Sequence, residues 1–107
     1  MTEELSTEVV TDDDATVVMV RGTIDLATCE RLRDAIEPHM GPEQTIVLDL
    51  SGVVFMDSSS IRVLVQARGE LTADGGSLVL RNPSSAARLV LTATATADLL
   101  VIDSESR

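Results

Sequence analysis

The feature that most constrains this fold is the junction between an apolar segment and a helix that begins with three consecutive serines. The stretch from Val54 to Gln66 reads V-F-M-D-S-S-S-I-R-V-L-V-Q, and it follows the very apolar segment Thr45 to Leu50. Asp57, Ser58 and Ser59 are all good N-cap residues, because their side-chain oxygens accept backbone N–H groups that a first helical turn leaves unpaired. The pattern therefore predicts a buried strand that leads into a helix, with hydroxyls at the exposed helix end.

Apolar residues at three- and four-residue steps predict two helices that each pack by one face. After the serines, the expected inward stripe is Ile61, Leu64, Val65, Arg68 and Leu71. The other stripe begins after Asp25, a natural N-cap, and comprises Leu26, Cys29, Leu32, Ile36 and Met40. Pro38 and Gly41-Pro42 are expected to end that helix.

Short segments rich in β-branched and aliphatic residues alternate with these helices. The expected strands are Thr7–Thr11, Ala15–Arg21, Gln44–Leu50, Ser77–Arg81 and Asp98–Asp103, with turns at Asp12–Asp14 and Ser51-Gly52, and with a third helix capped by Asn82-Pro83-Ser84-Ser85. After an initial hairpin, strands and helices alternate, and such crossovers are right-handed. The chain is therefore predicted to be one α/β domain over residues 1–107, with a mostly parallel central sheet of about five strands and helices packed mainly on one face.

Composition and charge exclude several functions. The formal net charge is −10, which disfavours nucleic acid and anionic membrane surfaces as partners, and the single Phe leaves no aromatic platform for bases. One cysteine and no apolar leader indicate a cytoplasmic protein without disulfides. Cys29 is expected to be a small buried hydrophobe, and His39 is a lone histidine at a helix end, so no metal site, cofactor site or catalytic group set is predicted.

On the residues alone, ordinary helix capping explains D-S-S-S without any modification. The order of three segments reverses that preference. L-D-L-S-G-V-V-F-M-D-S-S-S-I-R-V-L, from Leu48 to Leu64, resembles the phosphorylation segment of bacterial anti-sigma-factor antagonists of the STAS domain family, in which D-S-S-G-L opens a helix. V-R-G-T-I-D-L-A-T, from Val20 to Thr28, is similar to that family's G-E-L-D-x-x-T segment, and Asn82 to Leu91 resembles its third helix.

The resemblance implies a STAS-type domain that works by partner switching in transcription regulation. The unphosphorylated protein would bind an anti-sigma factor that is also a serine kinase, and so release the sigma factor. The kinase would phosphorylate Ser58, which would end binding, and a serine phosphatase would reverse the step. Asp57 would orient the Ser58 hydroxyl, and Ser59 and Ser60 would flank the phosphosite. The protein itself would not be an enzyme.

Two departures from the family pattern bear on this hypothesis. Ser60 stands where the family has glycine, and it is expected to crowd the docking surface mildly. The sequence ends soon after its last expected strand, so the family's final helix is expected to be short or missing, and the protein to be a monomer or weak dimer. The alternative function is a STAS scaffold or sensor module that is not phosphorylated.

Overall fold

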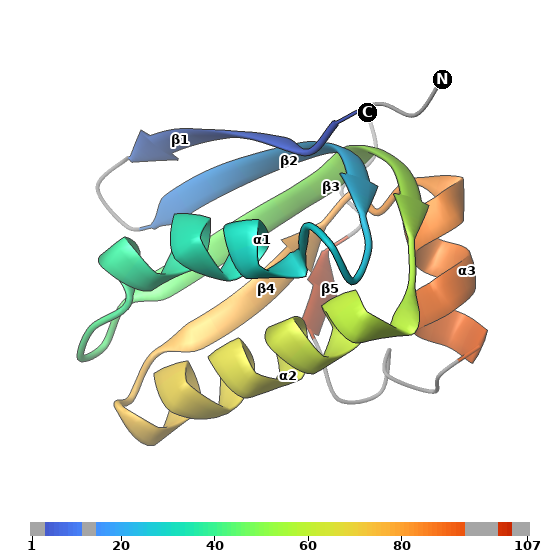
Figure 1. The fold of residues 1–107 in the computed structure, drawn as a ribbon. Helices are drawn as coiled ribbons and strands as arrows, with labels where there is room; N and C mark the ends of the chain where they lie inside the picture. The colour runs from blue at the N-terminus through green and yellow to red at the C-terminus, as the bar shows by residue number, and fades with distance from the viewer. Residues whose placement is uncertain (1–3, 12–14, 94–100, 104–107) are drawn as a thin grey trace.

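A five-stranded mixed sheet with β3 at its centre organises the chain. The structure, a computed structural model, describes residues 4–11, 15–93 and 101–103. The strands lie side by side in chain order: β1 (Ser6–Thr11), β2 (Thr16–Ile24), β3 (Thr45–Met56), β4 (Ser77–Arg81) and β5 (Val101–Asp103). β1 runs antiparallel to β2, and all other neighbours pair in parallel (Figure 1). The predicted mostly parallel sheet, with the Thr45–Leu50 segment in its centre, is confirmed.

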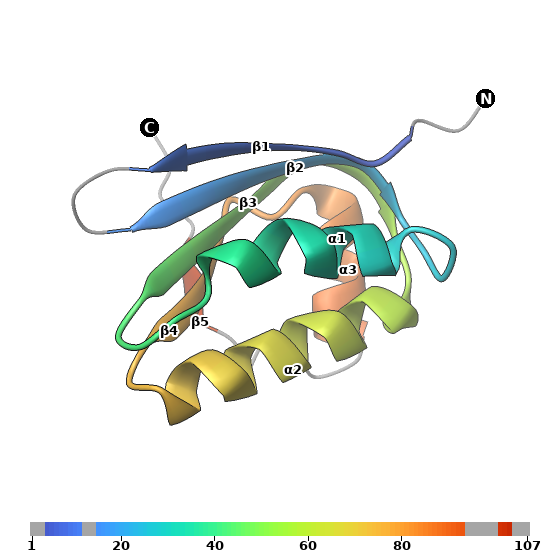
Figure 2. The same cartoon turned by 60° about the vertical axis from the view of Figure 1, so that its left-hand side comes forward.

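In the described part of the chain, three α-helices pack on this sheet. α1 (Cys29–Ile36) continues into a short 3-10 helix, η1 (Glu37–His39), and α2 spans Ser58–Ala73. These helices lie beside each other over one face of the sheet (Figures 1 and 2), as expected when neighbouring parallel strands are joined by right-handed crossovers. α3 (Ser85–Ala93) packs against β3. None of these helices is long and apolar enough to cross a bilayer.

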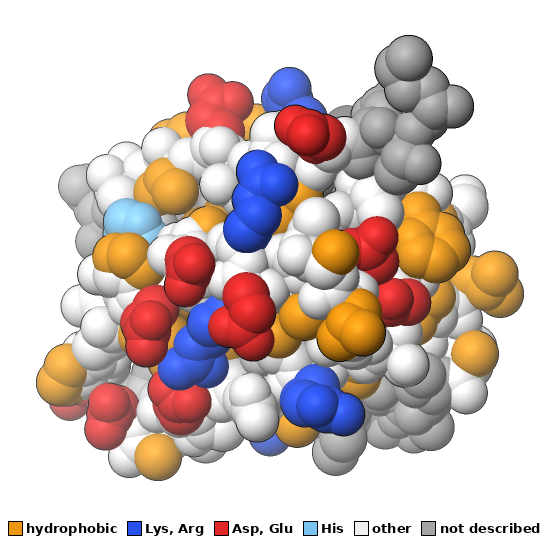
Figure 3. All heavy atoms as spheres, in the orientation of Figure 1, with side chains coloured by type: hydrophobic (Ala, Val, Ile, Leu, Met, Phe, Trp, Pro, Cys, Tyr) orange, Lys and Arg blue, Asp and Glu red, His pale blue; other side chains and the backbone are white. Residues whose placement is uncertain are grey.

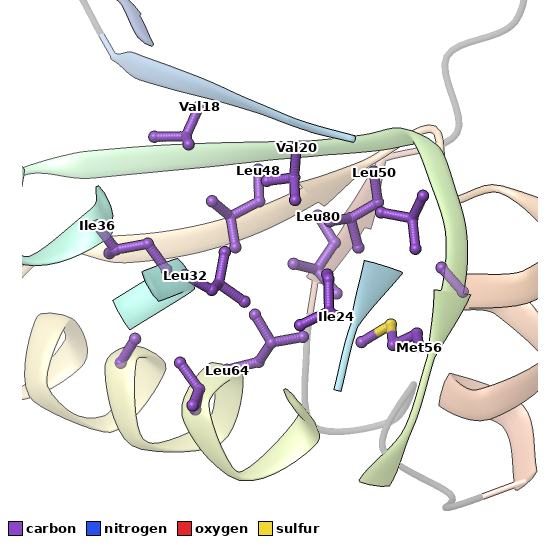
Figure 4. Packing of buried hydrophobic residues seen from close by; sticks show 14 of the residues in the cluster. Val18, Val20, Ile24, Leu32, Ile36, Leu48, Leu50, Met56, Leu64 and Leu80 are labelled. Carbon is purple, nitrogen blue, oxygen red and sulfur yellow. The ribbon is translucent and has the colours of Figure 1, made fainter. Parts of the chain in front are cut away.

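One hydrophobic cluster fills the space between the sheet and the helices (Figure 4). Leu48, Leu50 and Leu80 point from the sheet toward Leu32 and Leu64, and all five are 0% exposed. Each fully buried side chain of this size contributes roughly 1.5–3 kcal/mol to folding. The start of α2 is therefore held on a rigid base.

The two strands β2 and β3, which lead to α1 and α2, both extend further than the sequence predicted. β2 continues past Arg21 to Ile24, because Gly22 adopts a positive φ of 92° and lets the backbone of residue 4 approach. A Cβ atom added at Gly22 would lie 2.1 Å from the carbonyl oxygen of Glu4. β3 likewise continues through Ser51-Gly52, which was predicted to be a turn, because two register shifts keep it paired with β2 as far as Met56.

The buried face of α2 is rotated relative to the predicted stripe. Ile61, Leu64 and Leu71 are buried as expected, but Val65 is 36% exposed and Arg68 is only half-buried. The centre of the face is instead the line Ser60–Leu64–Ala67–Leu71, flanked by Ile61 and Val63. Steps of four, three and four residues define this line. The line includes Ser60, a polar residue that a search for apolar positions misses.

The predicted stripe was correct at the three residues that lie within α1 but not at its two ends. Met40 follows η1 and is half-buried against the core. Cys29, Leu32 and Ile36 are buried, whereas Leu26 is 76% exposed. α1 begins only at Cys29, so Leu26 lies in the preceding turn and does not follow the helical period. The predicted Asp12–Asp14 turn, the first residues of the Asp98–Asp103 strand and the chain beyond Asp103 lie outside the described residues.

Candidate functional site

The candidate site lies where β2 and β3 end side by side. Ile24 and Met56 are the last paired residues of the two strands. Each chain then turns toward a helix, β2 into α1 and β3 into α2. The backbone N–H of Asp57 donates to the carbonyl oxygen of Ile24 at 3.2 Å, which fixes the start of α2 against the end of β2.

Asp57 is the N-cap of α2, as predicted. Its backbone is extended, and its carboxylate accepts the backbone N–H of Ser59 at 3.0 Å as well as the Ser59 hydroxyl. Partial burial alone would raise the pKa of Asp57. Hydrogen bonds from the Ser59 side chain and from the backbone N–H groups of Ser59, Ser60 and Leu26 outweigh that effect and lower the pKa below its ordinary value. Asp57 is therefore a firmly held anion at neutral pH.

The three serines, which look alike in sequence, occupy three different environments. Ser58, the first residue of α2, is exposed, and its hydroxyl makes no hydrogen bond to any residue within the described ranges. Ser59 is half-buried and its hydroxyl donates to Asp57. Ser60 is 0% exposed. Only Ser58 thus combines exposure with a hydroxyl that is free to react.

The expectation that Ser60 crowds the docking surface is wrong. Its hydroxyl points into the protein, 2.7 Å from the carbonyl oxygen of Asp57 and 3.2 Å from that of Ile24. One turn of helix brings this side chain to the inner face, in line with Leu64. Ser60 therefore ties the first turn of α2 to the end of β2.

The turn between β2 and α1 forms the other wall of the site. Asp25 accepts hydrogen bonds from the backbone N–H groups of Ala27 and Thr28, and the Thr28 hydroxyl accepts from the backbone N–H of Asp25 at 2.9 Å. This reciprocal pair has the hydrogen-bond pattern of a capping box, but it lies in the turn before α1, whose N-cap is Thr28 and not the predicted Asp25. It explains why D-x-x-T recurs in the pattern noted above, and it holds the Leu26 N–H near the Asp57 carboxylate.

The other residues considered from sequence lie away from this site. Cys29 is buried in α1, as predicted, and His39 is a half-buried residue at the end of η1. Within the described ranges, no group of three or more His, Cys, Asp or Glu side chains gathers as a metal site would require. Arg62, one turn after Ser58, was not singled out from sequence.

Fold and site together define a small α/β module that presents one free serine hydroxyl at the end of its central strand. The family model for the STAS domain matches residues 6–106. The chain therefore belongs to the STAS domain family, as the resemblance of its three segments implied.

A protein with a similar sequence is an anti-sigma factor antagonist. The chain is 34% identical over 76 residues to the anti-sigma F factor antagonist of Lysinibacillus sphaericus, a match that covers 69% of this chain and 65% of that protein. It thus spans less than two thirds of that relative.

Two solved structures are similar over nearly the whole chain. An anti-sigma factor antagonist from Mycobacterium paratuberculosis matches with a TM-score of 0.84 at 25% identity, covering 95% of this chain and 87% of the other. The phosphorylated form of the Bacillus cell fate determinant SpoIIAA matches with a TM-score of 0.68 at 27% identity, covering 95% and 93%.

Proposed function

We propose that this protein is an anti-sigma-factor antagonist whose binding is switched by phosphorylation of Ser58. In the unphosphorylated state it binds an anti-sigma factor serine kinase in the cytoplasm and so frees the sigma factor. The kinase transfers the γ-phosphoryl group of ATP to the Ser58 oxygen, and the phosphoprotein dissociates. A serine phosphatase restores the active form. The protein acts as a regulatory partner and substrate, without catalytic activity of its own.

The observation that carries this proposal is the separation of the three serines by their environment. A kinase must reach a hydroxyl that no other group holds, and Ser58 alone is exposed and free, while Ser59 and Ser60 donate inward. The similarity to antagonists, one of them solved in a phosphorylated form, supports a switch by phosphorylation and an anti-sigma factor as the partner.

The switch follows from where the phosphate would lie. At the first residue of α2, a group of about −1.5 to −2 charge faces unpaired N–H groups and the positive end of the helix dipole, so the fold tolerates it. In a complex, the same dianion must lose its water in a contact surface beside the kinase nucleotide. A penalty of about 4 kcal/mol there weakens binding roughly a thousandfold.

Phosphorylation of wild-type protein and Ser58→Ala by a cognate kinase tests the site. We expect one phosphate on wild type, located at Ser58 by mass spectrometry, and none on Ser58→Ala. Ser59→Ala is the matched control and should still be phosphorylated. Phosphate on Ser59 or Ser60 in both wild type and Ser58→Ala would move the site, and no phosphate on any serine would favour a scaffold that is not phosphorylated.

A further inference from the structure

An exposed arginine lies one helical turn after Ser58 on the outer face of α2. Ser58 and Arg62 are both exposed, and both belong to the same helix. Residues four positions apart on a helix are surface neighbours, with Cβ atoms about 5–6 Å apart. The Arg62 side chain can therefore reach a group attached to the Ser58 oxygen.

Arg62 is free to take a new partner. Among the described residues it forms no ion pair and no hydrogen bond. The first turn of α2 holds no acidic residue that would compete for it. The acidic Glu70, further along the helix, is bound instead to Arg33 of α1, with Nη2 to Oε1 at 2.9 Å.

We infer that Arg62 is the counter-ion of the phosphate on Ser58, within the same helix. This inference rests on the proposed phosphorylation of Ser58. A phosphoserine offers three strong acceptor oxygens, and the planar guanidinium of arginine can bind two of them at once. The order also favours pairing, because an acidic group that precedes a basic one by four residues is the better orientation on a helix.

Because the phosphate pairs with Arg62, phosphorylation changes two charges on the docking surface. In the unphosphorylated protein, the exposed Arg62 lies one helical turn after Ser58, on the surface that the partner must approach. In the phosphoprotein the new dianion occupies the Arg62 guanidinium. The docking surface thereby gains negative charge and loses an available positive one, while the phosphate is held along α2.

Other charges near the site are the same in every variant used to test this pair. Acidic groups at this end of the molecule are Asp57 in the cap, Asp25 in the adjoining turn and Glu30 in the first turn of α1. Acidic and basic side chains are mixed over the face formed by α1 and α2 (Figure 3). The acidic groups raise the phosphate pKa equally in all variants, so the difference between variants isolates Arg62.

The test is a pH titration of the phosphoserine followed by ³¹P NMR, with phosphoserine installed at position 58 during translation of the full chain. Pairing with Arg62 favours the dianion, so the phosphate pKa in the wild-type background should be about 0.1–0.4 pH unit lower than in Arg62→Gln. Arg62→Lys should keep part of this shift. The difference should shrink in 1 M salt.

Arg68→Gln is the matched control, since it removes the same charge from the same helix at a position about 15 Å along the helix axis from Ser58. The phosphate pKa in Arg68→Gln should equal that in the wild-type background. Equal pKa values in wild type and Arg62→Gln, or an equal rise in Arg68→Gln, would overturn the inference. Since no kinase or partner takes part, failure of the proposed function would leave this titration unaffected.

Discussion

Replacing Ser60 tests whether its buried hydroxyl stabilises the start of α2. Ser60→Ala removes a hydrogen bond to the carbonyl oxygen of Asp57 at 2.7 Å. That carbonyl still accepts the Ser60 backbone N–H, and the Ile24 carbonyl still accepts the Asp57 N–H, so neither is left without a donor. The expected loss is therefore that of one ordinary hydrogen bond, partly offset by the better helix propensity of alanine, or about 0.5–1 kcal/mol.

Ser60→Gly, the residue of the family pattern, should lose more. Glycine in a helix costs roughly 0.5–1 kcal/mol relative to alanine because its backbone loses more freedom on folding. The glycine variant should therefore unfold at a free energy about 0.5–1 kcal/mol below that of the alanine variant. Ser60 thus stabilises the start of α2 by a contact that glycine cannot make.

Urea unfolding followed by far-UV circular dichroism measures both losses, since the chain has no Trp or Tyr for fluorescence. Ser58→Ala, at the exposed position two residues earlier, is the control and should stay within about 0.5 kcal/mol of wild type. An alanine variant as stable as wild type, or a glycine variant more stable than the alanine one, would refute the assigned role of the Ser60 hydroxyl.

Three further predictions concern packing, pH and an ion pair. Leu64→Ala should cost about 2–5 kcal/mol by urea unfolding, because Leu64 is fully buried; a loss under about 0.5 kcal/mol would contradict its place in the core. Asp57, with its lowered pKa, contributes stability that is present above its unfolded pKa of about 3.9 and is lost as pH falls through the folded pKa. The stability gap between wild type and Asp57→Asn should therefore narrow from pH 5 to pH 2, and a constant gap would exclude the carboxylate as its cause. A double-mutant cycle on Arg33 and Glu70 should give a coupling of about 0.2–1 kcal/mol that falls in 1 M salt, whereas a salt-independent coupling would argue against an exposed ion pair.

The sheet and the site segment were predictable because their signals are local. Four of the six residues of the Thr45–Leu50 segment are Ile, Val or Leu, as in a strand that is largely buried on both faces, and D-S-S-S has the residues of a helix start. β4 was predicted with its observed bounds, Ser77–Arg81, because Gly75-Gly76 marks the turn before it. Patterns of this kind depend only on neighbours in the chain.

The errors have a common cause in contacts between distant segments. The extension of β2 beyond Gly22 depends on the approach of residue 4, and the extension of β3 through Ser51-Gly52 depends on pairing with β2. No local pattern contains either contact. Sequence reasoning therefore ended both strands at their glycines, although each strand continues to the edge of the site.

In the candidate site too, features with a local sequence signal were predicted, and features that depend on contacts between distant segments were not. Capping chemistry predicted the N-cap to be among Asp57, Ser58 and Ser59, and it is Asp57. The choice of Ser58 among the serines came from the resemblance to the family. Ser60 was misplaced because a polar residue at a helix start usually faces water, whereas here the carbonyl oxygens of Ile24 and Asp57 accept its hydroxyl. Leu26 was assigned to the core because an apolar stripe does not reveal where its helix begins.

Binding of the Ser58 phosphoprotein to its anti-sigma factor kinase tests the switch most directly. Calorimetry should show tight binding by unphosphorylated wild type and by Ser58→Ala, and binding at least about a thousandfold weaker by protein carrying phosphoserine at position 58. Circular dichroism of the phosphoprotein should be unchanged, which separates lost contact from lost fold. Undiminished affinity of a folded phosphoprotein would contradict the proposed mechanism.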